Sequence, residues 1–126
     1  MAETEKITIN MNVVDLGKVD LLVNQGFYSN RTEFIKSSIR HQLMSHAKDV
    51  DHVITQKSYV LGVTHYSRQD LEKLLVENKI LDVKVVGLLM FDEDIDAEIL
   101  IKTIKSVNIF GVLKATNEVK AAIKSL

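Results

Sequence analysis

Polar and apolar residues alternate strictly near the start of the chain, in residues 6–12. The stretch KITINMN places Ile7, Ile9 and Met11 at every second position, which is the period of a β-strand with one buried face. No second strand pattern follows until Tyr59. Because an isolated strand leaves its backbone donors and acceptors unpaired, we expect this strand to pair with its copy in a second chain.

Two helical patterns follow this strand. Apolar residues recur at helical spacing over residues 13–25, with Asn12 as the predicted N-cap and Gly26 as the predicted stop. The second pattern begins after Ser29, its predicted N-cap, and continues to about residue 46. The N-terminal unit is therefore predicted to run strand, helix, turn, helix.

Three apolar runs of the second half can be aligned on a central glycine. These glycines, Gly62, Gly87 and Gly111, are 25 and 24 residues apart. Each run is followed by a helical pattern, respectively SRQDLEKLLVEN, DIDAEILIKTIKSV and NEVKAAIKSL. The repeat predicts three β-α units with parallel strands, because a helix separates each strand from the next. We interpret the glycines as packing residues that let helix and strand approach closely.

The predicted strands are apolar on both faces. In the middle strand one face carries Val83, Val85 and Leu89, and the other carries Val86, Leu88 and Met90. Repeats of nearly equal length imply the same winding step each time, which places every helix on one face. The other face must then meet a protomer or a partner, so we predict further self-association through residues 58–126. The alternative is a doubly wound sheet with a ligand crevice at its strand ends.

The predicted fold class is α/β, in two parts. Residues 1–46 form a dimerising strand-helix-helix unit, residues 47–57 a polar connector, and residues 58–126 the β-α repeat domain. The connector contains neither Pro nor Gly, so it is also compatible with a longer second helix.

Composition narrows the possible functions. The chain has 126 residues, of which 46% are hydrophobic, as in a globular protein. The start MAETEK lacks the regions of a signal peptide, and no apolar run approaches the roughly 20 residues of a membrane span, so we expect a cytoplasmic protein. The absence of Cys excludes disulfides and thiolate sites. With a net charge of −1, binding to nucleic acid requires a local patch.

The N-terminal pattern resembles the ribbon-helix-helix family of DNA-binding proteins, the group of the Arc and MetJ repressors. The resemblance covers about residues 5–45 and rests on KITINMN, on VDLLVNQG at residues 19–26 and on GFYSNRTEFIKSSIR at residues 26–40. The chain departs from the family at Asn12, where many members carry Pro, and in having Lys6 as the only cation on the ribbon. The resemblance implies a homodimer whose two-stranded ribbon enters the major groove of double-stranded DNA.

The resemblance also implies two sets of DNA contacts. On the ribbon, Lys6 is suited to guanine, Thr8 to several base edges and Asn10 to adenine. At the start of the second helix, we expect the phosphate contacts to come from free backbone amides and from three side chains, Ser29, Asn30 and Arg31. The alternative interpretation is that all six are ordinary surface and capping residues.

Other motifs give weaker indications. Asp92, Asp94 and Asp96 have the alternate spacing of a calcium loop, but the loop's Gly and closing Glu are missing, and carboxylates that open a helix explain them better. The four His residues form no pair on one helical turn, which argues against a metal-responsive regulator. No phosphate-binding glycine loop or G-x-S-x-G motif occurs, so we predict no enzyme, cofactor or metal site.

Two classes of function follow from these patterns. The first is a sequence-specific DNA-binding transcriptional regulator, most simply a repressor, that acts as a homodimer or a higher oligomer. The second is an antitoxin-like or plasmid-partition interaction protein whose carboxyl-terminal half binds another protein. Both share the N-terminal unit, and they differ in what residues 58–126 contact.

Overall fold

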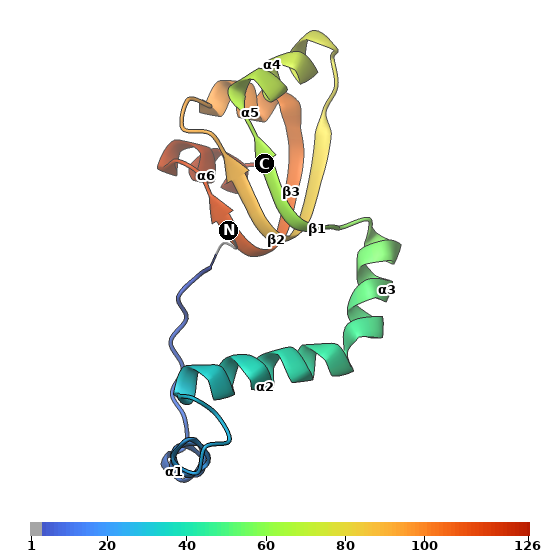
Figure 1. Cartoon of the computed structure of the whole chain (residues 1–126). Coiled ribbons are helices and arrows are strands. Elements are labelled where there is room, and N and C mark those ends of the chain that lie inside the picture. Colours follow the sequence, from blue (N-terminus) through green and yellow to red (C-terminus); the bar gives the residue numbers. More distant parts are fainter. Residues whose placement is uncertain (1–3) are drawn as a thin grey trace. The chain divides into compact units, whose positions relative to one another are not determined.

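The computed structural model describes residues 4–126 and divides into two compact units, Thr4–His52 and Val53–Leu126. Figure 1 shows their elements in chain order, and each unit is described by itself. No helix among residues 4–126 is long and apolar enough to cross a membrane.

Two helices make up most of the first unit, α1 (Val13–Asn24) and α2 (Arg31–Ser45). The predicted N-cap of α1 is confirmed, because Oδ1 of Asn12 accepts a hydrogen bond of 2.8 Å from the amide of Val14. The predicted stop is also confirmed. Gly26 follows the helix with a φ of +86°, a left-handed conformation that glycine adopts without steric cost.

The predicted N-cap of α2 is wrong by one residue. Asn30, not Ser29, caps the helix, and its Oδ1 accepts a hydrogen bond of 2.8 Å from the amide of Glu33. Asn and Ser are almost equally good N-caps, so propensity alone does not distinguish two neighbouring candidates. The position of the cap moves the start of α2 to Arg31.

A third helix, α3 (Ala47–Lys57), occupies residues 47–57, which the sequence predicts as a polar connector or as an extension of the second helix. All residues of this helix are exposed except Ile54, which is half-buried. A polar composition is therefore compatible with a helix at this position. His46 ends α2 with a φ of −108° and separates the two helices. The boundary between the compact units lies within α3, between residues 52 and 53.

The second unit consists of three β-α units. Their elements are β1 (Val60–Tyr66), α4 (Arg68–Val76), β2 (Leu81–Phe91), α5 (Ala97–Thr103), β3 (Ile104–Lys114) and α6 (Asn117–Lys124). The strands form a parallel sheet in the order β1-β2-β3, and Gly62, Gly87 and Gly111 lie opposite one another in it. The predicted repeat and the parallel strands are thereby confirmed.

The middle helix is shorter than its sequence pattern predicted. The segment DIDAEILIKTIKSV is helical only over α5, and β3 begins immediately at Ile104. Ile104 pairs with Leu81 across the sheet, and Oγ of Ser106 donates to the Asp82 carboxylate over 2.7 Å. Pairing with the long strand β2 therefore overrides the helical periodicity of this segment.

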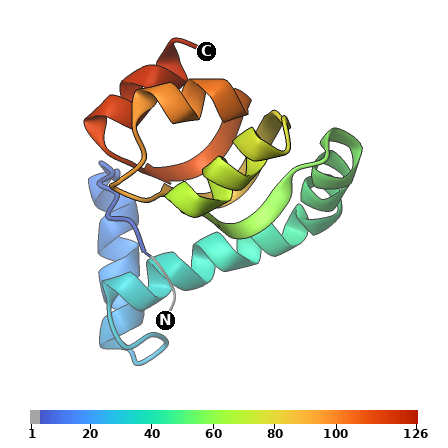
Figure 2. The same cartoon turned by 90° about the horizontal axis from the view of Figure 1, so that it is seen from above.

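The three helices of the second unit pack on one face of the sheet. In Figure 2, α4 (yellow-green), α5 (orange) and α6 (red) lie side by side within the curve of the strands. The core between helices and sheet consists of Leu71, Val83, Val85, Leu89, Phe91, Ile95, Ile99, Leu100, Ile104, Val119 and Ala122. This arrangement matches the expected constant winding step, and α4, α5 and α6 leave the second face of the sheet uncovered.

The aligned glycines bring strand close to strand, not helix close to strand as we expected. Gly87 and Gly111 have φ values of +134° and +125°. A Cβ atom on Gly87 would strike the carbonyl oxygen of Gly62, and one on Gly111 would strike that of Gly87. Glycine is required here because both the backbone conformation and the neighbouring strand exclude a side chain.

Candidate nucleic-acid interface

The arm that precedes α1 carries the predicted base-contacting residues. In the single chain, residues 4–12 form neither helix nor strand, and the side chains of Lys6, Thr8 and Asn10 are exposed. The apolar residues between them are exposed as well, Ile7 by 71% and Ile9 by 60%. The arm thus carries exposed apolar side chains that alternate with exposed polar side chains, and the single chain buries neither group.

The first unit lacks a core of its own. Val19 is the only fully buried residue among Thr4–His52. The large apolar side chains that stay exposed in this unit are Ile7, Ile9, Val13, Val14, Leu21, Phe27, Ile39, Leu43, Met44 and Val50. One buried side chain is little for a unit of this size, and this exposed apolar surface is a candidate for contact with a partner.

The start of α2 offers hydrogen-bond donors. Asn30 satisfies the amide of Glu33, and the amide of Phe34 donates to the carbonyl oxygen of Asn30 over 3.3 Å. The earlier amides of Arg31 and Thr32 have no intrahelical acceptor, as at every helix N-terminus. Ser29 is exposed immediately before them. The predicted phosphate-contacting residues therefore lie together at the positive end of the helix dipole.

Arg31 already has a partner, which the sequence pattern did not predict. Its Nε and Nη2 atoms donate to the two carboxylate oxygens of Asp20 on α1, over 2.7 and 2.8 Å. This hydrogen bonding holds the pKa of Asp20 below its ordinary value. The guanidinium group keeps three further N–H donors, but the carboxylate cancels its charge locally. Asp20 and Arg31 are eleven residues apart, so no local spacing rule predicts their contact.

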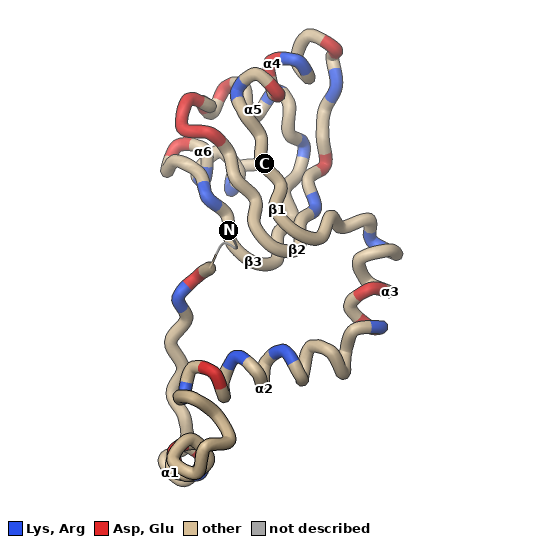
Figure 3. The backbone as a smooth tube through the Cα atoms, viewed as in Figure 1, with Lys and Arg blue, Asp and Glu red and all other residues tan. Residues whose placement is uncertain are grey.

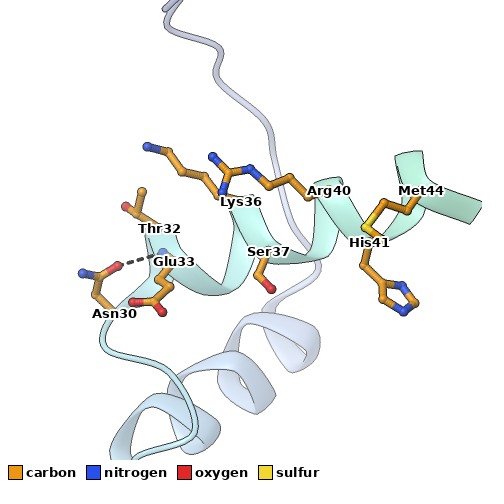
Figure 4. Close-up of a pocket in the computed structure, with 8 residues that line it drawn as sticks. All are labelled: Asn30, Thr32, Glu33, Lys36, Ser37, Arg40, His41 and Met44. Carbon is orange, nitrogen blue, oxygen red and sulfur yellow. Dashed lines mark hydrogen bonds between the residues drawn. The ribbon is translucent and has the colours of Figure 1, made fainter. Parts of the chain in front are cut away.

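Two further cations lie on α2. Lys36 and Arg40 are one helical turn apart, and their side chains extend from the same side of the helix as Thr32 (Figure 4). All three line an open groove of about 850 Å³, together with Asn30 and four other residues of α2. The (i, i+4) spacing of the two cations was visible in the sequence and predicts a shared helix face. Figure 3 shows this basic segment of α2.

The acidic run before α5 has a structural role. Oδ1 of Asp96 accepts a hydrogen bond of 2.9 Å from the amide of Ile99 and so caps α5. Its other carboxylate oxygen lies 3.2 Å from Nη1 of Arg68. Both contacts lower the pKa of Asp96, the capping bond most. Within residues 4–126, no three His, Cys, Asp or Glu side chains come close enough together to hold a metal ion.

Comparison with known proteins identifies a family. Residues 2–120 match a family model described as the Ribbon-Helix-Helix transcriptional regulator family. The match spans both compact units, so the β-α repeats are part of the family pattern along with the arm and its helices. No curated protein and no solved structure matches the chain significantly.

Proposed function

Because this chain belongs to the ribbon-helix-helix transcriptional regulator family, we propose that it is a homodimeric, sequence-specific repressor that acts in the cytoplasm. Two copies of the arm pair as an antiparallel ribbon that enters the major groove, which is about 12 Å wide and accepts two strands. The observation that carries the proposal is the arm itself, whose exposed Ile7 and Ile9 alternate with Lys6, Thr8 and Asn10.

Pairing of the arms supplies the core that the first unit lacks. With a period of two, Ile7, Ile9 and Met11 share one face of the ribbon, and Lys6, Thr8 and Asn10 share the other. The apolar face covers exposed residues of α1 and α2 from both chains, and the polar face remains free for DNA. The dimer presents each polar residue twice, so we expect an operator with two-fold symmetry.

The polar face of the ribbon reads the bases. Asn10 pairs with adenine through N6 and N7, and Lys6 donates to guanine O6 or N7. The Thr8 hydroxyl donates to or accepts from a base edge, or the Thr8 side chain touches a thymine methyl group. Lys6 is the only charged member of the set, so these contacts contribute sequence preference more than electrostatic affinity.

The start of α2 holds the phosphate backbone. The amides of Arg31 and Thr32, the hydroxyl of Ser29 and the side-chain amide of Asn30 present donors at one helix end. Oδ1 of Asn30 is occupied by the cap, so its Nδ2 donates to phosphate. Asp20 orients Arg31 while some of its donors remain available. Lys36, in the next turn, adds a cation on the same helix.

The test of this function is selection of bound DNA from a random pool, followed by the variant Asn10→Ala on the selected site. We expect an enriched two-fold symmetric motif, and we expect Asn10→Ala to cost about 1–3 kcal/mol on it and to relax preference at one position. Asn117→Ala, at the first residue of α6, is the matched control and should bind normally. A pool without enrichment at low salt would refute the proposal.

A further inference from the structure

The face of the sheet opposite the helices carries a compact apolar patch. Leu61, Val86 and Phe110 lie opposite one another across the strands, and so do Val63, Leu88 and Val112. These two rows flank the row of aligned glycines, and we call their six side chains the outer patch. Alternation along the strands directs them away from the core residues Val85 and Leu89.

The outer patch is exposed at its corners. Leu61, Val63 and Phe110 are 65%, 61% and 63% exposed, whereas Leu88 at its centre is only 6% exposed. Parallel sheets occur almost only with both faces covered. The apolar sides of α4, α5 and α6 are already used on the inner face of the sheet. None of these three helices can therefore cover the outer patch as well.

The character of the patch favours a copy of itself. Its six residues include no charge, and a two-fold contact brings like residues together, so a charge near its centre would face its own copy. Two strand spacings make the patch about 10 Å wide, and its two rows lie about 7 Å apart along the strands. These dimensions give an area far below the roughly 800 Å² per partner of an independent stable interface.

So small a contact forms only where the local concentration of the partner is high. We infer that the outer patches of the two chains joined by the ribbon pack against each other, so that the second units pair within the DNA-binding dimer. The inference rests on the proposed ribbon dimer, which tethers the two sheets at an effective concentration of order millimolar. The paired sheets then limit the spacing of the two N-terminal units on DNA.

Cross-linking tests this pairing, because the chain has no Cys and one introduced thiol is unique. Full-length Val86→Cys, at the centre of the patch, is treated with a short bis-maleimide at low protein concentration. Val76→Cys on α4 is the control, since Val76 is 86% exposed and therefore more reactive. We expect Val86→Cys to form cross-linked dimers at least about fivefold faster, and the native mass to remain that of two chains.

Additional substitutions distinguish a failure of this inference from a failure of the proposed function. Phe110→Asp or Leu61→Asp in the Val86→Cys background should reduce cross-linking to the control rate without loss of the second unit's circular dichroism or of DNA binding. Ile9→Asp should abolish both cross-linking and DNA binding, because it removes the tether.

Equal rates for Val86→Cys and Val76→Cys, or cross-links in a native assembly of four chains, would overturn the pairing even if DNA binding persists. Absence of a DNA motif alongside fast cross-linking would instead overturn the proposed function.

Discussion

At the scale of single residues, the pair Asp20–Arg31 limits the positive charge at the start of α2, where we propose that phosphate binds. The pair connects α1 to the first turn of α2 through two hydrogen bonds. Both side chains are about half exposed, so the pair contributes little to stability. Because the pKa of Asp20 is lowered, its carboxylate stays ionised as the pH falls to its ordinary pKa, and the cancellation of charge persists there.

We predict that Asp20→Asn strengthens non-specific DNA binding. The substitution leaves the charge of Arg31 without its counter-charge beside the phosphates. The slope of log affinity against log salt should steepen by up to about 0.9 per chain, the value for one additional phosphate contact. Asp15→Asn, also on α1, makes the same change in net charge at a residue that does not contact Arg31. An equal effect of both variants would show that net charge, not the pair, sets the affinity.

At the scale of the elements, glycine contacts between strands determine how closely the parallel sheet can assemble. Gly62 lies on an edge strand, and a Cβ atom there would meet no other atom, although its φ of +122° still disfavours a side chain. Gly87 has the same backbone conformation and in addition faces the carbonyl group of Gly62. Comparing substitutions at these two positions therefore distinguishes the cost of backbone strain from the cost of steric overlap.

We predict that Gly62→Ala costs about 1–2 kcal/mol of the free energy of unfolding of the second unit, from backbone strain alone. Gly87→Ala should cost about 1–3 kcal/mol more, because the methyl group forces the strands apart. Urea denaturation followed by circular dichroism measures both values. Equal costs at the two glycines would mean that the contact between the strands is not the reason for glycine at residue 87.

The elements that could be predicted from the sequence are those fixed by residues close together in the chain. The caps at Asn12 and Gly26 and the strand repeats follow from spacing and residue type, and the structure confirms them. The early end of α5 depends on pairing with Leu81, which no local pattern contains. For the site, the sequence predicted that Ser29, Asn30 and Arg31 lie together at the start of α2. It did not predict the partner of Arg31, because Asp20 lies eleven residues away on another helix.

At the scale of the whole molecule, the two units differ in what stabilises them. The second unit has a continuous core of eleven buried residues within one chain. The first unit buries only Val19 among residues 4–52 and depends on the proposed ribbon for the rest. In the proposed dimer, the folding of the first unit is therefore coupled to dimerisation, whereas that of the second is not.

We predict that Ile9→Asp unfolds the first unit and leaves the second folded. A carboxylate in the shared core would be buried without a partner, at a cost too large for so small a unit. Sedimentation should give a monomer, and hydrogen exchange should be fast in residues 13–45 and slow in β2. Thr8→Asp places the same charge on the polar face of the ribbon and should remain dimeric. A dimeric Ile9→Asp variant with protected α1 and α2 amides would contradict the ribbon.

The register of Gly62, Gly87 and Gly111 also bears on how such a unit grows. Each β-α step meets the previous one through the same backbone contact, because Gly111 approaches Gly87 as Gly87 approaches Gly62. Duplication of residues 88–111 would add one more step of the same length and extend the stack at its edge, without redesign of the existing core. Gene duplication or deletion in whole steps can therefore lengthen or shorten this unit while the N-terminal arm stays unchanged.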